Sequence, residues 1–144
     1  LRQSEDIECW LRIAITTDWT FEGVPGLLTQ YRISGGALSA NTDRQFKTWQ
    51  QMINKLTPLD PELFAEHVPA ARAYQLRYLA RRAISDRNAS HALSLVKKSL
   101  KTSKRPLIEE PVKTIVTLAA AYVLAAAGPM ALDVLNAKSE QKNA

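Results

Sequence analysis

The sequence predicts a mainly α-helical chain that carries one small α/β piece near its start. Apolar residues recur at helical spacing through residues 41–136, and an alternating pattern rich in strand-forming residues covers residues 18–33. One helix and two strands are too small to form a domain alone. We therefore expect residues 1–40 to end a larger α/β domain, residues 41–136 to form a helical extension, and residues 137–144 to be a disordered tail.

The first expected element is a helix over residues 7–16. Ser4, followed by Glu5 and Asp6, is typical of a helix start, because a hydroxyl can cap the first turn and carboxylates favour the positive end of the helix dipole. The apolar residues at helical spacing are expected to lie on one side of this helix: Ile7, Trp10, Leu11, Ala14 and Ile15.

Two strands are expected next, over residues 18–24 and 27–33. Both segments are rich in strand formers, Pro25-Gly26 between them is a turn signal, and Gly35-Gly36 ends the second one. The pattern predicts a helix followed by a two-stranded unit.

Five further helices are expected after residue 41. The first runs to about Leu56, and the second begins at Pro61, where the missing N–H of proline costs least. Pro69 is expected to interrupt that helix, Asn88 to cap a later one, and Glu110-Pro111 to begin the last. The faces expected to be buried carry Leu76, Leu79, Ala80, Ala83 and Ile84, then Ala92, Leu93, Val96 and Leu100.

The composition restricts the class of protein but selects no function. Apolar residues make up 46% of the 144 positions and charged residues 23%, which is typical of a globular protein. The net charge of +5 suits anionic partners in general. Cys9 is the only cysteine, so we expect a reducing, cytoplasmic compartment. Thr114–Leu132 is uncharged but rich in alanine and broken by Gly128-Pro129, which favours a buried helix over a membrane span.

Four motifs at the start of the chain carry a family resemblance. In order along residues 3–41 they are Glu5-Asp6, Trp10-Leu11-Arg12, Tyr31-Arg32 and Gly36-Ala37-Leu38-Ser39. In this order and spacing the chain resembles the C-terminal portion of family 2 glycosyltransferases of the GT-A fold. Tyr78–Ala83 and Glu110-Pro111 are similar, more loosely, to the helical tails of many bacterial members.

The resemblance implies an inverting transfer of a sugar from a nucleotide-sugar donor to a hydroxyl of a glycan or lipid-linked acceptor. Asp6 would be the general base, because the acceptor hydroxyl must lose its proton as it attacks the anomeric carbon, and Glu5 would orient the site. Arg32 is the candidate contact to the departing diphosphate, and Tyr31 is expected to bind substrate beside it.

Two further residues are candidates for substrate binding. Arg12 would either contact substrate or pair with Glu8, one turn earlier on the helix. Trp19 is the better candidate for stacking on an acceptor sugar, because Trp10 stands on the apolar stripe and favours core packing.

The resemblance also implies a divalent cation, Mg²⁺ or Mn²⁺, in the intact enzyme. Many relatives have a histidine three residues after the motif tyrosine, but this chain has Ser34 there, so no metal ligand is assigned. The donor-binding sheet and its Asp-x-Asp motif are expected to precede Leu1. We therefore expect a fragment that is inactive alone.

The basic residues of the helical tail leave several interpretations open. They are Arg72, Arg77, Arg81, Arg82, Arg87, Lys97, Lys98, Lys101, Lys104 and Arg105. A solvated surface is the first interpretation, and peripheral contact with the inner face of an anionic membrane, or with a polyanionic acceptor, is the second. No nucleic-acid-binding motif is present. Residues 73–107 also resemble one tetratricopeptide-like hairpin, so a protein-interaction module is the alternative to an enzyme.

Overall fold

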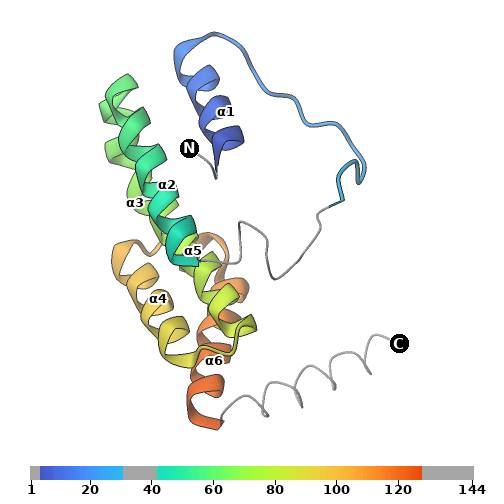
Figure 1. Ribbon diagram of the computed structural model, residues 1–144, viewed down its shortest axis with the longest axis vertical. Helices are drawn as coiled ribbons and strands as arrows, with labels where there is room; N and C mark the ends of the chain where they lie inside the picture. The colour runs from blue at the N-terminus through green and yellow to red at the C-terminus, as the bar shows by residue number, and fades with distance from the viewer. Residues whose placement is uncertain (1–3, 31–41, 128–144) are drawn as a thin grey trace. The chain divides into compact units, whose positions relative to one another are not determined.

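The computed structural model describes residues 4–30 and 42–127, in which the chain forms six α-helices and one short 3-10 helix (Figure 1). The chain divides into two compact units, Leu1–Glu66 and His67–Ala144. The expected boundary at residues 40 and 41 and the expected tail at 137–144 lie outside the described residues.

The predicted α/β piece is wrong. Residues 18–30 form no strand and run as irregular chain with a bend at Pro25-Gly26, where Gly26 has a φ of 113°. Residues 31–33 of the second expected strand lie outside the described part. Alternation marks a segment that can pair, but a strand exists only when a neighbour accepts and donates its hydrogen bonds, and an isolated pair is marginal in water. Throughout the described ranges the fold is all-helical.

Helix α1, Glu5–Thr16, begins where the sequence predicts but does not bury the expected face. Ser4 occupies the N-cap with a left-handed φ of 76°, and its side chain makes no capping hydrogen bond. Ile7 is 44% exposed and Trp10 is 55% exposed, so their predicted core positions are wrong. The buried residue of α1 is instead Glu8, because the helix meets α2 through an ion pair, not through its apolar stripe.

Helix α2, Thr42–Leu56, ends at the predicted residue, and helix α3, Pro61–Ser85, begins at the predicted proline. The short helix η2, Thr57–Leu59, lies between them and was not expected. The predicted interruption at Pro69 is wrong, since α3 continues through it. An interior proline costs about 3 kcal/mol by removing one helical hydrogen bond and crowding the preceding turn. Residues buried on either side, Phe64 at 7% and Ala73 at 0% exposure, favour keeping the helix despite that cost.

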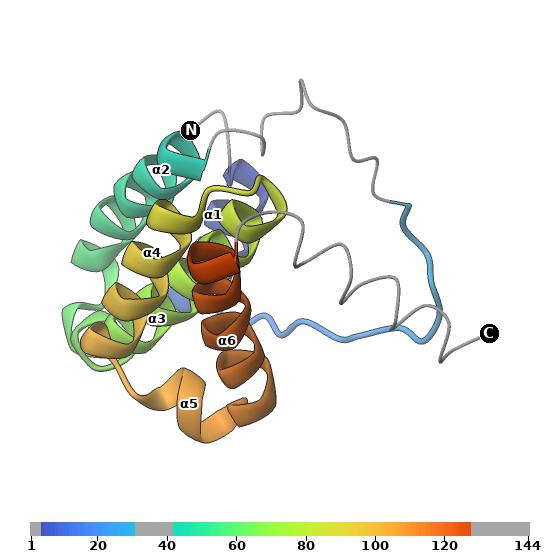
Figure 2. The ribbon, with the colours of Figure 1, turned by 90° about the horizontal axis from the view of Figure 1, so that it is seen from below.

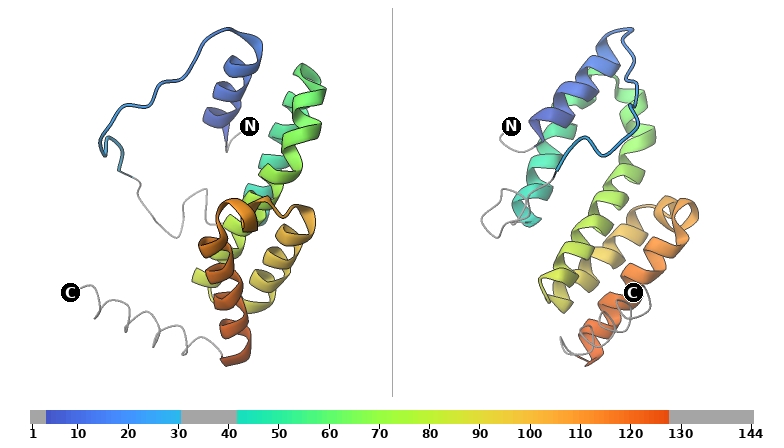
Figure 3. Two further views of the ribbon diagram at one scale, coloured as in Figure 1. Left: turned by 180° about the vertical axis from the view of Figure 1, so that it is seen from behind. Right: turned by 90° about the vertical axis from the view of Figure 1, so that its right-hand side faces the viewer.

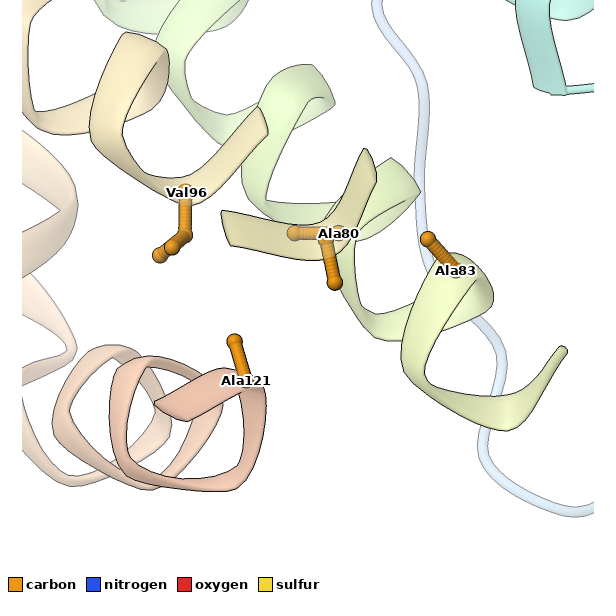
Figure 4. Packing of buried hydrophobic residues seen from close by; sticks show 5 residues of the cluster. Ala80, Ala83, Val96 and Ala121 are labelled. Carbon is orange, nitrogen blue, oxygen red and sulfur yellow. The ribbon is translucent and has the colours of Figure 1, made fainter. Parts of the chain in front are cut away.

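The second unit contains α4, Ala89–Thr102, the short α5, Arg105–Glu109, and α6, Pro111–Ala127. Helices α4 and α6 pack against one another, with α5 at the turn between them (Figures 2 and 3). Asn88 caps α4 as predicted, since its side chain accepts a hydrogen bond from the backbone N–H of His91. The core cluster joins α3, α4 and α6 (Figure 4) and consists of Ala80, Ala83, Ala92, Val96 and Ala121.

Small side chains set the spacing of these helices. Alanine at a contact lets two helix axes approach closely, because little side-chain volume separates the backbones. The close approach is visible in a further contact, in which the buried Ser99 hydroxyl donates to the backbone oxygen of Ala73 at 2.6 Å. The predicted inner faces of α3 and α4 are confirmed: Leu76, Leu79 and Val96 are at most 1% exposed. No helix in the described ranges has the length and apolarity needed to cross a membrane.

Candidate functional site

The candidate carboxylates Glu5 and Asp6 occupy the first turn of α1, and both are exposed. The Oδ1 atom of Asp6 accepts a hydrogen bond from the backbone N–H of Ile7 at 2.8 Å. Within residues 4–30 and 42–127, neither carboxylate takes part in an ion pair. The site therefore offers a carboxylate that one backbone N–H orients and that a solvent-borne hydroxyl can reach, at the end of a helix where negative charge is favoured.

Glu8 anchors α1 to α2. Its Oε1 atom accepts a hydrogen bond from Lys55 Nζ at 2.9 Å and lies 3.4 Å from Arg12 Nε. The hydrogen bond from Lys55 is the main cause that lowers the pKa of Glu8 from its ordinary value of 4.5, and partial burial opposes it. Lys55 was not singled out from the sequence, because a pair 47 residues apart leaves no local signal.

Arg12 pairs with Glu8, which is the structural one of the two roles that the sequence allows for it. Besides the pair with Glu8, its guanidinium lies 3.9 Å from the sulfur of Cys9, and its side chain is 49% exposed. In the described structure Arg12 therefore stabilises the helix. Its substrate contact stays a prediction.

Trp19 lies beyond the C-terminal end of α1 and is 76% exposed. Its backbone N–H donates to the Thr17 hydroxyl at 3.2 Å. Asp6 is at the opposite end of the helix, ten residues before Thr16, which corresponds to about 15 Å along the axis. The structure thus leaves the indole of Trp19 open to a ligand but does not bring it next to Asp6. Tyr31, Arg32 and Ser34 lie outside the described residues.

The part of the chain that the structure describes contains no cluster of side chains that could bind a metal ion. There, no three His, Cys, Asp or Glu side chains come close enough together to hold one. The described residues therefore do not form a site for the expected Mg²⁺ or Mn²⁺, whose ligands the resemblance implies to lie mostly outside this chain.

A second polar cluster, in the second unit, was not predicted. The buried guanidinium of Arg77 donates to Thr114 Oγ1 at 2.8 Å and to the Pro106 carbonyl at 3.4 Å, and it pairs with Glu110. It also lies over the ring of Tyr74, 5.1 Å from the centroid. The sequence places Arg77 among the basic residues of an exposed surface, whether solvated or in contact with an anionic partner, but its side chain is buried.

The electrostatics of this cluster follow from its pairing. Hydrogen bonds from Lys113, first, and from Arg77 lower the pKa of Glu110 from 4.5 to about 2. The hydroxyl of Tyr74 donates to Glu109, and this hydrogen bond raises the pKa of the tyrosine. Because Arg77 is occupied by three partners from α5, α6 and the turn between them, the cluster is a cross-link between helices and not an open anion site.

Comparisons with known proteins assign no family. No family model matches the chain, and no curated protein or solved structure matches it either.

Proposed function

We propose that this chain is the C-terminal part of an inverting glycosyltransferase, which transfers a sugar from a nucleotide-sugar donor to a hydroxyl of a glycan or lipid-linked acceptor. The observation that carries the proposal is the position of Asp6. It stands with Glu5 on the first turn of α1, exposed, four residues before the Trp10-Leu11-Arg12 motif on the same helix. The single cysteine of the chain favours a reducing compartment, and the proposal places the reaction in the cytoplasm.

The chemistry assigned to Asp6 is removal of one proton. As the acceptor oxygen forms its bond to the anomeric carbon, the bond from that carbon to the nucleoside diphosphate breaks, and the acceptor proton passes to the carboxylate. The hydrogen bond from the Ile7 N–H to Oδ1 holds the carboxylate in place, which leaves Oδ2 for the acceptor hydroxyl. A general base positioned in this way contributes roughly 10²- to 10⁴-fold to the rate.

The apolar stripe of α1 also supports the proposal. Ile7 and Trp10, one turn apart, are both about half exposed, and Ala14, a further turn on, is exposed as well. An amphipathic helix owes most of its stability to the packing of such a stripe. In the proposed enzyme, this stripe is where the donor-binding half covers α1, so that Asp6 comes to lie at the edge of the donor pocket.

The test is made in the intact enzyme, which includes the donor-binding half. Asp6→Asn removes the base without changing the size of the side chain, and we expect turnover to fall at least about 100-fold while the dissociation constant for the nucleotide-sugar donor changes little. The matched control is Asp18→Asn, which alters an exposed carboxylate beyond the end of α1 and is expected to keep the parent rate. A parent rate in Asp6→Asn would disprove the assignment of the base.

A further inference from the structure

The outer face of α6 is apolar from one end to the other. We define this face by residues that share one side of the helix: Val112, Ile115, Val116, Ala119 and Tyr122. All are exposed, with Val112 at 73%, Val116 at 60% and Ile115 at 56%. The opposite side carries Thr114 and Ala121, which are buried in the core of the second unit. A helix that is apolar on all sides is expected to be covered on all sides.

The rim of this face is basic. Lys97 of α4 places its ammonium over the ring of Tyr122, 5.5 Å from the centroid, and Lys101 is exposed one turn further along α4. Lys113 stands at the other end of the face, next to Val112, with a side chain that is 60% exposed. From residue 89 to residue 127 there are six Lys and Arg and two Glu, a formal charge of 6 − 2 = +4.

One of the two acidic groups of this region neutralises Lys113, but neither pairs with Lys97 or Lys101 among the described contacts. Glu110 is paired with Arg77 and Lys113, and Glu109 accepts a hydrogen bond from the Tyr74 hydroxyl and lies 3.8 Å from Arg105. Both carboxylates are therefore engaged by neighbours at the start of α6. The outer face thus combines an uncharged centre with a positive edge that Lys97 and Lys101 of α4 supply.

We propose that the outer face of α6 docks onto an anionic lipid bilayer, with the helix lying along the surface. Val112, Ile115 and Val116 would enter the boundary between headgroups and acyl chains, as the apolar side of an interfacial helix does. The lysines would extend their apolar stems over that boundary and place their ammonium groups among lipid phosphates. This inference goes beyond the proposed sugar transfer and does not depend on it.

Charge decides between a membrane and a second copy of the chain. In a two-fold dimer built on this face, the same patch would meet itself, so the lysine rim of one copy would face the lysine rim of the other. Like charges at an interface oppose association. A bilayer containing anionic lipid presents the opposite charge to the rim and apolar material to the centre, and so is complementary to both parts.

The test measures partition of the full chain onto vesicles of phosphatidylcholine, with and without phosphatidylglycerol, by co-sedimentation. We expect binding to the anionic vesicles. Val116→Ser should weaken it about tenfold through lost apolar burial, and Lys97→Gln about fivefold on anionic vesicles alone. The matched controls are Val24→Ser and Lys47→Gln, which alter an exposed valine and an exposed lysine in the first unit and should leave partition unchanged.

The possible results separate the proposal from its competitors. Because Val116 and Lys97 lie outside the core, circular dichroism should show the parent fold in both variants. Binding that responds to Lys97→Gln but not to Val116→Ser would overturn the proposal, since a basic surface alone would explain it. So would a folded chain that ignores anionic vesicles, or a dimer in light scattering that Val116→Ser dissociates while vesicles bind nothing. Losses in both variants with unchanged controls would support the docking face, whatever the outcome at Asp6.

Discussion

Arg77→Met tests the idea that a buried guanidinium holds α3 to the α5–α6 turn. The substitution keeps the apolar stem of the side chain and removes the donors to Thr114 at 2.8 Å and to the Pro106 carbonyl at 3.4 Å, together with the pair to Glu110. A hydrogen bond from a charged donor contributes about 1.5–3 kcal/mol, and the longer contact to Pro106 adds less.

The remaining partners limit the loss. The Thr114 hydroxyl still donates to the Pro106 carbonyl at 2.5 Å, and Glu110 still pairs with Lys113, so of the three acceptors it is the buried Thr114 oxygen that loses its donor. The side chain of Glu110 is also 32% exposed, so water can replace part of the pair. We therefore expect a loss of about 3 kcal/mol in the free energy of unfolding, at the low end of the cost of breaking a buried pair.

The assay is urea denaturation of the full chain followed by circular dichroism, with thermal melts in parallel. A loss of 3 kcal/mol lowers the melting temperature of a unit of this size by roughly 12–24 °C. Arg81→Met is the matched control, since Arg81 is exposed one turn later on α3, and its variant should stay within about 0.5 kcal/mol of the parent. Equal stabilities of Arg77→Met and Arg81→Met would refute the cross-link.

The same cluster gives a pH dependence with a definite sign. The pKa of Glu110 in the folded chain, about 2, is below its ordinary value of 4.5, so the folded state stabilises the ionised carboxylate. This contribution is complete above about pH 4.5 and is lost as the pH falls toward 2. In Arg77→Met the acid-induced loss should become smaller but persist, because Lys113 is the larger cause of the shift.

Three further predictions concern separate parts of the fold. Asn88→Ala removes the acceptor for the His91 N–H at the start of α4 and should cost about 1 kcal/mol in urea denaturation; no change would mean that the cap is not formed. Val96→Ala leaves a cavity at a fully buried site where α4 meets α6 and should cost about 2 kcal/mol, whereas a loss below 0.5 kcal/mol would contradict that packing. Lys55→Met should return the pKa of Glu8 toward its ordinary value in a carboxyl NMR titration, and an unchanged pKa would show that another group stabilises that carboxylate.

The helical part of the fold could be predicted because its signals are local. A Pro at the first position of α3, the Asn88 cap and the apolar spacing of residues 76–84 each act through residues within one or two turns. The predicted interruption at Pro69 is wrong because the outcome there depends on non-local packing. Its local preference is to break a helix, and burial on both sides of it, a property of the folded chain, outweighs that preference.

The candidate site divides in the same way. That Glu5 and Asp6 share the first turn of a helix follows from sequence, and so does their chemical capacity to accept a proton. The sequence does not predict that α1 turns Glu8 inward and leaves Trp10 exposed. This orientation depends on Lys55, which α2 supplies.

The sequence by itself determined where α1, α3, α4 and α6 begin and which faces of α3 and α4 are buried, since caps, prolines and 3.6-residue periodicity act within a few residues. Tertiary structure alone decided that residues 18–30 form no strand, that Arg77 points inward, and that α6 keeps a second apolar face open. Each of these depends on whether a partner distant in the chain is present to pair a backbone, accept a guanidinium or cover a side chain.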